Sequence, residues 1–180
     1  MSIDIPTALT EVEAVALTQL AAGKRVLEVG SLLGFSTVTM ARVAEHVTSI
    51  DPHEGYPVDN PRPTWPLFNG NLEHFGVADQ VTAFKADDSM LLAYEVLEDG
   101  EEAFEFAFID ATGTYEDTIR IIERVVDVMH VDAPILAVHD YGIAAWPGAG
   151  EAVRDYCTQN LLNFGVVDTL ALIRLGHPDD

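Results

Sequence analysis

Acidic and polar side chains follow four of the predicted β-strands, at the point where each strand ends. In chain order they are Asp51; Asp87, Asp88 and Ser89; Asp110; and His139 with Asp140. Such side chains can accept the hydroxyls of a ribose, hold a divalent cation or move a proton. Because ligands of open α/β sheets bind at the carboxyl ends of the strands, we expect these residues to line one site.

A glycine-bearing turn lies within residues 26–37, VLEVGSLLGFST, between an apolar run and a predicted helix. Small residues at Gly30 and Gly34 let backbone N–H groups and a helix N-terminus approach a ligand closely. The G-x-x-x-G spacing differs from the G-x-G-x-x-G of dinucleotide-binding turns. With Glu28 two residues before Gly30, the turn suits a ligand that carries an amino acid and a nucleoside but no phosphate.

On these residues the chain resembles the class I S-adenosylmethionine-dependent methyltransferases, whose first motif is (Asp/Glu)-x-Gly-x-x-x-Gly. The continuation at residues 34–37 is similar to the small-molecule O-methyltransferase branch. Residues 110–116 and 138–141 resemble the catechol-type and macrolide-sugar members of that branch. The resemblance implies cofactor contacts from the first motif, namely Glu28, Gly30, Ser31, Gly34 and Ser36. Glu28 would hold either the turn or the ammonium group of the methionine.

Asp51 lies 21 residues after Gly30, where a carboxylate can accept both ribose hydroxyls. The same spacing suits NAD, and Asp51 could instead cap a turn before Pro52. After the third strand, the resemblance implies adenine contacts from Asp87, Asp88 or Ser89. Either acid could alternatively be a helix N-cap without a ligand, and the sequence does not choose between the two acids.

In metal-dependent members of the resembling branch, an acid after the fourth strand and a pair after the fifth hold Mg²⁺. The matching positions here are Asp110, His139 and Asp140, and Asp110 would also face the cofactor. His139 departs from the pattern, because an imidazole suits Mn²⁺, Fe²⁺ or Zn²⁺ better than Mg²⁺. It could instead be the general base that removes the acceptor proton, or a turn residue without a metal.

Two base residues of the family are missing, which leaves the general base open. Gly113 stands where a histidine often precedes the Thr/Ser-Tyr-Glu, and the lysine that some members carry three residues after the acid is absent. We therefore place His139 first and His53 second as candidates for the catalytic base, with Asp110 beside them.

Short apolar runs alternate with amphipathic segments along the chain, which is the pattern of a parallel sheet covered on both faces. Strands are predicted at 26–29, 47–50, 81–85, 104–109, 134–138 and 164–175, and helices at 7–22, 36–46, 68–75, 89–97, 116–129 and 150–162. The predicted fold is therefore α/β, Rossmann-like and doubly wound, with a mostly parallel sheet and an antiparallel edge strand. The 180 residues are expected to form one domain, residues 1–180.

Residues 52–66 contain five prolines with Tyr56 and Trp65, and they are predicted to form a lid loop over the ligand. A second aromatic loop at residues 141–150 contains Trp146, which could form another wall of the acceptor pocket. These two loops are expected to determine which acceptor is bound.

Thirty acidic residues against nine lysines and arginines give a net charge of −21. That charge repels phosphate backbones and anionic membranes, so we expect neither as a partner. One cysteine, Cys157, and the absence of a signal-peptide pattern predict a cytoplasmic protein. The sequence predicts S-adenosylmethionine, with Mg²⁺ or Mn²⁺ as a possible second cofactor, a small hydroxylated acceptor and, by resemblance, a homodimer. An NAD-dependent oxidoreductase, a non-catalytic S-adenosylmethionine-binding protein and a nucleic-acid methyltransferase are the alternatives.

Overall fold

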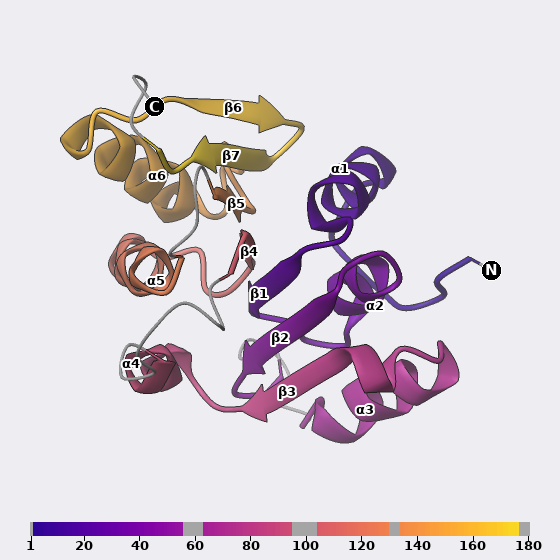
Figure 1. Ribbon diagram of the computed structural model, residues 1–180. Coiled ribbons are helices and arrows are strands. Elements are labelled where there is room, and N and C mark those ends of the chain that lie inside the picture. The colour runs from indigo at the N-terminus through magenta and orange to yellow at the C-terminus, as the bar shows by residue number, and fades with distance from the viewer. Residues whose placement is uncertain (1, 56–62, 95–103, 130–133, 177–180) are drawn as a thin grey trace.

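The computed structural model describes residues 2–55, 63–94, 104–129 and 134–176. Within them, seven strands form one sheet in the order β3-β2-β1-β4-β5-β7-β6 (Figure 1). The strands are β1 (Arg25–Val29), β2 (His46–Asp51), β3 (Val81–Lys85), β4 (Phe106–Ile109), β5 (Ile135–Val138), β6 (Phe164–Val167) and β7 (Leu170–Arg174). The predicted last segment thus forms a hairpin of two strands.

Strands β1 to β5 pair in parallel with their neighbours. Strand β7 is antiparallel to both β5 and β6 and lies between them. A dinucleotide-binding sheet has the order 3-2-1-4-5-6, so the inserted β7 distinguishes this sheet from that fold. The predicted fold class, a Rossmann-like and mostly parallel sheet with an antiparallel component at its edge, is confirmed.

Helices cover both faces of the sheet (Figure 1). One face carries α1 (Glu11–Ala21), α2 (Phe35–Ala41) and α3 (Trp65–His74), and the other carries α4 (Leu91–Tyr94), α5 (Tyr115–Asp127) and α6 (Pro147–Gln159). Two short 3₁₀ helices, η1 (Ala78–Gln80) and η2 (Asp88–Met90), flank β3. Along β4, Phe106 and Phe108 pack toward the first layer and Ala107 and Ile109 toward the second, as the two-residue period of a strand requires.

Several predicted helix boundaries were wrong. Helix α2 ends at Ala41 instead of residue 46, because the chain turns at 42–44 to let His46 pair with Arg25. Helices α3 and α6 begin earlier than predicted, at Trp65 and Pro147. Each has a proline in its first turn, where the missing N–H costs no hydrogen bond. The last three residues of the helix predicted at 89–97 lie outside the described residues.

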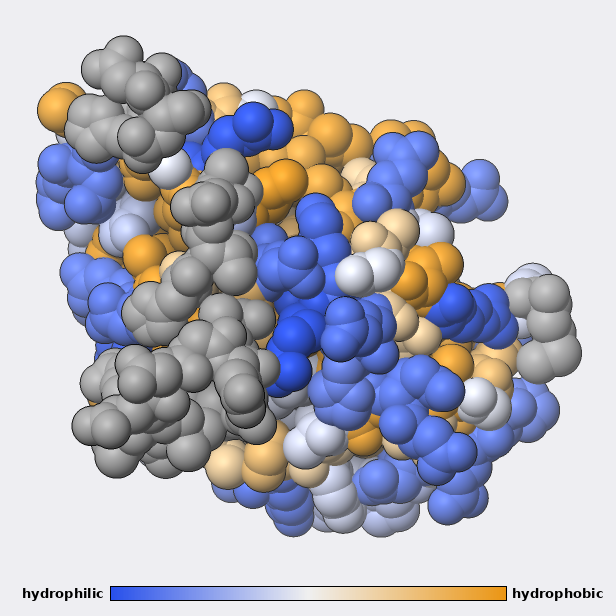
Figure 2. Space-filling model, viewed as in Figure 1, coloured by the Kyte–Doolittle hydropathy of each residue, from blue (hydrophilic) through white to orange (hydrophobic). Residues whose placement is uncertain are grey.

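Helix α1 begins at Glu11, four residues later than predicted, with a capping box in which Thr10 and Glu13 satisfy each other's backbone N–H groups. Among the described helices, none is long and apolar enough to cross a membrane. On the face drawn in Figure 2, hydrophilic residues gather near the middle and along the lower edge, and apolar residues form patches between them.

Candidate active site

The turn after β1 requires glycine at two positions. Gly30 has a φ of 93°, and a Cβ built on it would lie 2.0 Å from the backbone oxygen of Asp110. Gly34 has a φ of 89° and precedes the first residue of α2. Any side chain at Gly30 would therefore separate the loops that follow β1 and β4. These two adjacent strands lie at the point where the strand order reverses, which is where open sheets bind ligands.

Glu28 lies beneath this turn and is fully buried. Its two carboxylate oxygens accept hydrogen bonds of 2.5 Å from the hydroxyls of Ser36 and Thr37 in α2. Burial raises the pKa of Glu28 to about 7, although both hydroxyls oppose this rise. The sequence left two roles open for Glu28, namely holding the turn or binding the ammonium group of the methionine. These contacts favour the first role, and a contact with the cofactor stays a prediction.

Asp51, at the end of β2, binds the same turn from the other side. Its Oδ2 accepts the backbone N–H groups of Ser31 and Leu32, each at 2.8 Å, and its Oδ1 accepts that of His53 at 2.5 Å. The Ser31 hydroxyl is buried without a hydrogen-bond partner among the described residues. Asp51 and Ser31 thus place a carboxylate and an unsatisfied hydroxyl together in the turn.

His53, the second candidate for the general base, lies with Asp51 and away from the β4 and β5 ends. Its ring is 1% exposed, and its Nδ1 lies 3.0 Å from the Thr64 hydroxyl. The ring also packs against Trp65 and Phe68, with centroids at 4.9 Å and 4.8 Å. Burial lowers the pKa of His53. These contacts describe a packed core histidine that anchors the segment before α3.

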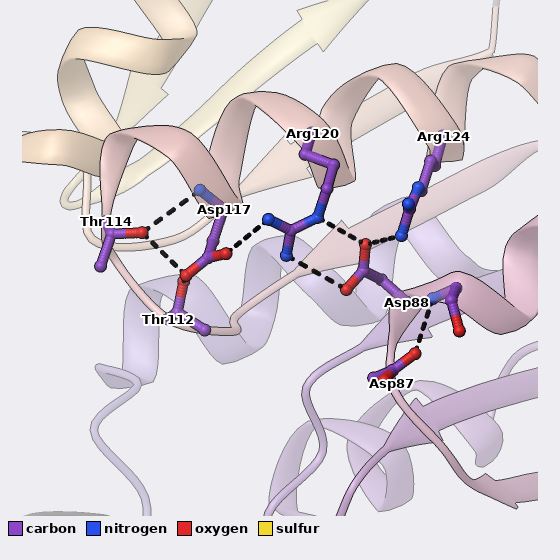
Figure 3. Close-up of polar contacts among 8 residues, drawn as sticks. Asp87, Asp88, Thr112, Thr114, Asp117, Arg120 and Arg124 are labelled. Carbon is purple, nitrogen blue, oxygen red and sulfur yellow. Dashed lines mark hydrogen bonds and ion pairs between the residues drawn. The ribbon is translucent and has the colours of Figure 1, made fainter.

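The two acids after β3 have different partners (Figure 3). Asp87 caps η2, because its Oδ1 accepts the backbone N–H of Ser89 at 2.9 Å. Asp88 turns toward α5, where Arg120 binds both of its oxygens at 3.1 Å and 3.3 Å and Arg124 forms a further ion pair. The capping role left open from the sequence applies to Asp87, while Asp88 is paired with arginines. Their contacts with adenine stay predictions.

Arg120 continues this set of contacts to the loop after β4. Its Nη1 donates to Asp117 at 2.6 Å. Asp117 in turn accepts the hydroxyls of Thr112 at 3.2 Å and Thr114 at 2.9 Å (Figure 3). We call Asp88, Arg120, Arg124 and Asp117 the arginine bridge, since they join the loops that follow β3 and β4.

The structure brings Asp110, His139 and Asp140 together at the ends of β4 and β5. One potential ligand atom from each lies within 4.8 Å of the others. Nδ1 of His139 is 3.3 Å from Oδ1 of Asp110 and 3.3 Å from Oδ1 of Asp140. These residues line a small cavity of about 10 Å³, which is close to the space that one water or small ion occupies. We call this group the strand-end cluster.

A third acid, Glu13 of α1, completes the surroundings of His139. Its Oε2 lies 3.5 Å from Nε2 of the ring. Burial lowers the pKa of His139, but its hydrogen bond to Asp110 and the charges of three acids outweigh burial and raise the pKa to about 9. Burial raises the pKa of Asp140. The sequence did not predict this contact between Glu13 and His139.

The loops after β4 and β5 pack closely beside the strand-end cluster. A Cβ on Gly148 would lie 2.3 Å from the backbone nitrogen of Tyr115, and one on Gly113 would lie 3.0 Å from Cβ of Trp146. Trp146, which is 39% exposed, therefore covers the loop that follows Asp110. Of the other predicted pocket aromatics, Trp65 packs on His53 and Tyr56 lies outside the described residues.

Fold and site together define a class I methyltransferase. The chain belongs to the family described as a methyltransferase domain, whose model matches residues 27–141. It shares its fold with cofactor-bound Rv0187 from MTB (TM-score 0.71, 23% identity, 96% of this chain and 84% of that one). It is also similar to the O-methyltransferase from Bacillus cereus in complex with SAH (TM-score 0.67, 16% identity, 95% and 84% covered). A third is TomG from Streptomyces achromogenes, an O-methyltransferase of tomaymycin synthesis in complex with SAM (TM-score 0.67, 18% identity, 94% and 82% covered).

No curated protein sequence matches the chain. The family match confirms the resemblance to S-adenosylmethionine-dependent methyltransferases and disfavours the oxidoreductase alternative.

Proposed function

We propose that this protein transfers the methyl group of S-adenosylmethionine to a hydroxyl oxygen of a small molecule, with a divalent cation held by Asp110, His139 and Asp140. The observation that carries the proposal is the strand-end cluster, in which two carboxylates and an imidazole meet at the ends of adjacent parallel strands. The methyl donor follows from the family, and the cation and the hydroxyl acceptor are inferred from the cluster.

The charges around the cluster fit a cation. Within the described residues, the ion pairs of Asp110, Asp140 and Glu13 all involve His139, and no lysine or arginine takes part. Three acids therefore share one imidazole. A set of two carboxylates and one imidazole suits Mn²⁺ or Fe²⁺ and, less well, Mg²⁺. When bound, such a cation lowers the pKa of a hydroxyl that it contacts.

The turn after β1 offers a matching site for the methyl donor. Ser31 presents a buried hydroxyl that has no hydrogen-bond partner in the described part of the chain, and the Asp51 carboxylate accepts the backbone N–H of the same residue. Because Gly30 has no side chain, this turn can lie directly against the backbone of Asp110, next to the cluster. Donor and acceptor can therefore be positioned side by side, and positioning supplies much of the rate in such a transfer.

His139 fits a ligand role better than that of general base at neutral pH. Against the effect of burial, the hydrogen bond to Asp110 and the charges of three acids raise the pKa of His139 to about 9, which favours the protonated ring and disfavours a role as proton acceptor. Nδ1 of His139 would hold the cation together with Asp110 and Asp140, and the cation would lower the pKa of an acceptor hydroxyl that it contacts. Trp146, above the loop after Asp110, is positioned to contact a flat or apolar part of the acceptor.

The net charge of −21 supports a small molecule over a nucleic acid as the acceptor. A lid at residues 52–66, of which 56–62 lie outside the described residues, remains part of the proposal, as do one domain over residues 1–180, a homodimer and a cytoplasmic location. The last of these is supported by the single buried cysteine, Cys157.

Calorimetry with S-adenosylhomocysteine and Mn²⁺, followed by methyl-transfer assays on catechols, phenols and sugars, tests the proposal. We expect both ligands to bind and transfer to depend on Mn²⁺. Asp51→Asn should weaken S-adenosylhomocysteine binding at least tenfold, whereas the exposed control Asp79→Asn should not. Binding of S-adenosylhomocysteine without transfer to any acceptor would favour the non-catalytic alternative, and absence of binding would refute the methyl donor.

A further inference from the structure

Glu13 reaches the strand-end cluster from α1, outside the loops that follow the strands. Its carboxylate is fully buried, although a capping box needs no burial. One oxygen, Oε1, accepts the backbone N–H of Thr169 at 2.9 Å and its hydroxyl at 2.6 Å. The other, Oε2, accepts the backbone N–H of Thr10 at 2.9 Å and lies 3.5 Å from Nε2 of His139. Burying a charge is costly, so these contacts call for a reason beyond capping.

The Thr169 hydroxyl determines which nitrogen of His139 carries a proton. This hydroxyl has one hydrogen, and its short contact with Glu13 uses it. Its second contact, 3.3 Å to Nε2 of His139, must therefore be one in which the hydroxyl accepts. Nε2 then faces two acceptors, the Thr169 oxygen and Glu13, and has to be the protonated nitrogen.

A proton held on Nε2 leaves Nδ1 as the nitrogen that can give up its own proton and offer its lone pair to a cation. Nδ1 is the atom that lies 3.3 Å from both Asp110 and Asp140. Thr169 is itself fixed, because its backbone oxygen accepts the N–H of Tyr141 just after β5. The contacts of Glu13 thus orient the ring as well as choose its tautomer.

We propose that Glu13 is a positioning residue for His139: together with Thr169 it holds the Nε2 proton, so that Nδ1 is presented to a cation shared with Asp110 and Asp140. This inference rests on the cation site proposed above. A carboxylate that binds the outer nitrogen of a metal-bound histidine fixes the ring and commonly changes metal affinity 10- to 100-fold when it is removed.

Mn²⁺ alone is the probe, with binding to the full chain measured by calorimetry or electron paramagnetic resonance. Glu13→Gln should weaken binding about 10- to 100-fold, and Thr169→Val should weaken it in the same direction. The matched control is Glu11→Gln, an exposed acid two residues away on α1, which should bind as the wild type does. Gln still supports a capping box, and Thr169→Val leaves Glu13 in place to cap α1. Wild-type affinity in both test variants would overturn the inference.

A second readout separates this inference from the proposed function. The Nε2–H proton of His139, assigned by its loss in His139→Gln, should give a slowly exchanging NMR signal without any metal. The signal should disappear in Glu13→Gln and Thr169→Val and persist in Glu11→Gln. If the wild type fails to bind Mn²⁺ but shows this pattern, the cation proposal fails and the positioning role stands. A signal unchanged in both test variants would refute the positioning role.

Discussion

Asp88 and Asp110 both follow a parallel strand of the same sheet, yet the charges around them are balanced in opposite ways. Asp88 is paired with two arginines of α5, both partly exposed, at 41% and 23% of their side chains. Asp110 shares a single imidazole with Asp140 and Glu13. The arginine bridge is thus complete with its own residues, whereas the strand-end cluster carries an excess of negative charge.

This difference separates structural from functional acids in a chain with thirty of them. An acid that already has two cations has little to offer a ligand, and its loss should act on stability. An acid that shares one positive charge with other acids is stabilised by a bound metal ion, so its substitution should weaken ligand binding. The following predictions test that distinction.

The largest expected effect is on the strand-end cluster. Asp110→Asn and Asp140→Asn should each weaken Mn²⁺ binding on the order of 100-fold or more, because loss of an outer partner alone costs 10- to 100-fold. Methyl transfer should fall in parallel. Asp88→Asn should change the Mn²⁺ affinity less than about threefold, since its charge is balanced elsewhere. Equal losses in Asp88→Asn and Asp110→Asn would remove the distinction between the two regions.

Glu28 differs from Asp88 and Asp110, because burial favours its protonated, uncharged form. Its pKa in the folded protein is about 7, against an ordinary value of 4.5. Below pH 4.5 both folded and unfolded chains carry the proton. Between pH 4.5 and 7 the unfolded chain ionises first, so the free energy of unfolding should fall by roughly 3 kcal/mol and then level off.

Urea denaturation of wild type and Glu28→Gln across pH 4.5 to 8 measures this contribution. The variant should lack that decline, and its stability relative to the wild type should therefore increase with pH. The amide keeps one acceptor for the Ser36 or Thr37 hydroxyl. A difference between the two proteins that is independent of pH would show that Glu28 does not titrate in this range.

The fold could be predicted from the sequence because local patterns were sufficient for it. Buried strands appear as apolar runs, and the turn at Gly30 and the capping box at Thr10 have short-range signatures. One error came from a tertiary contact, because helix α2 ends early so that β2 can pair with β1. The other errors named above were local, because α3 and α6 each begin earlier than predicted with a proline in the first turn.

The site could be predicted as a set of residues, but not as a set of contacts. Strand ends correctly placed Asp110, His139 and Asp140 together. The roles of Asp87 and Asp88 could not be distinguished from the sequence, because the role of Asp88 depends on Arg120, which lies 32 positions further along the chain. Glu13 was missed for the same reason: its partner Thr169 lies 156 positions away. An acid on the buried face of a helix indicates a functional contact only when the element that packs against that face is known.

Loss of the arginine bridge should reduce stability without abolishing binding. Asp88→Ala leaves Arg120 and Arg124 without their shared partner and removes charge-assisted hydrogen bonds. We expect a loss of about 2 kcal/mol in the free energy of unfolding, measured by urea denaturation. Glu116→Gln, an exposed acid of the same helix, should stay within about 0.5 kcal/mol of the wild type. An unchanged free energy of unfolding in Asp88→Ala would mean that the arginine bridge contributes no more than an ordinary surface contact.

The smallest effect should distinguish the two arginines of the bridge. Arg120 contacts Asp88 through Nε and Nη2 and Asp117 through Nη1, so its planar fork joins η2 to the first turn of α5 (Figure 3). A lysine ammonium cannot reproduce that fork, and Arg120→Lys should cost about 1 kcal/mol, a value already reduced for its exposure. Arg124 contacts Asp88 through Nη1, a geometry that an ammonium can imitate, so Arg124→Lys should cost less than about 0.5 kcal/mol. Equal losses in the two lysine variants would mean that charge alone, and not the shape of the guanidinium, holds the loops after β3 and β4 together.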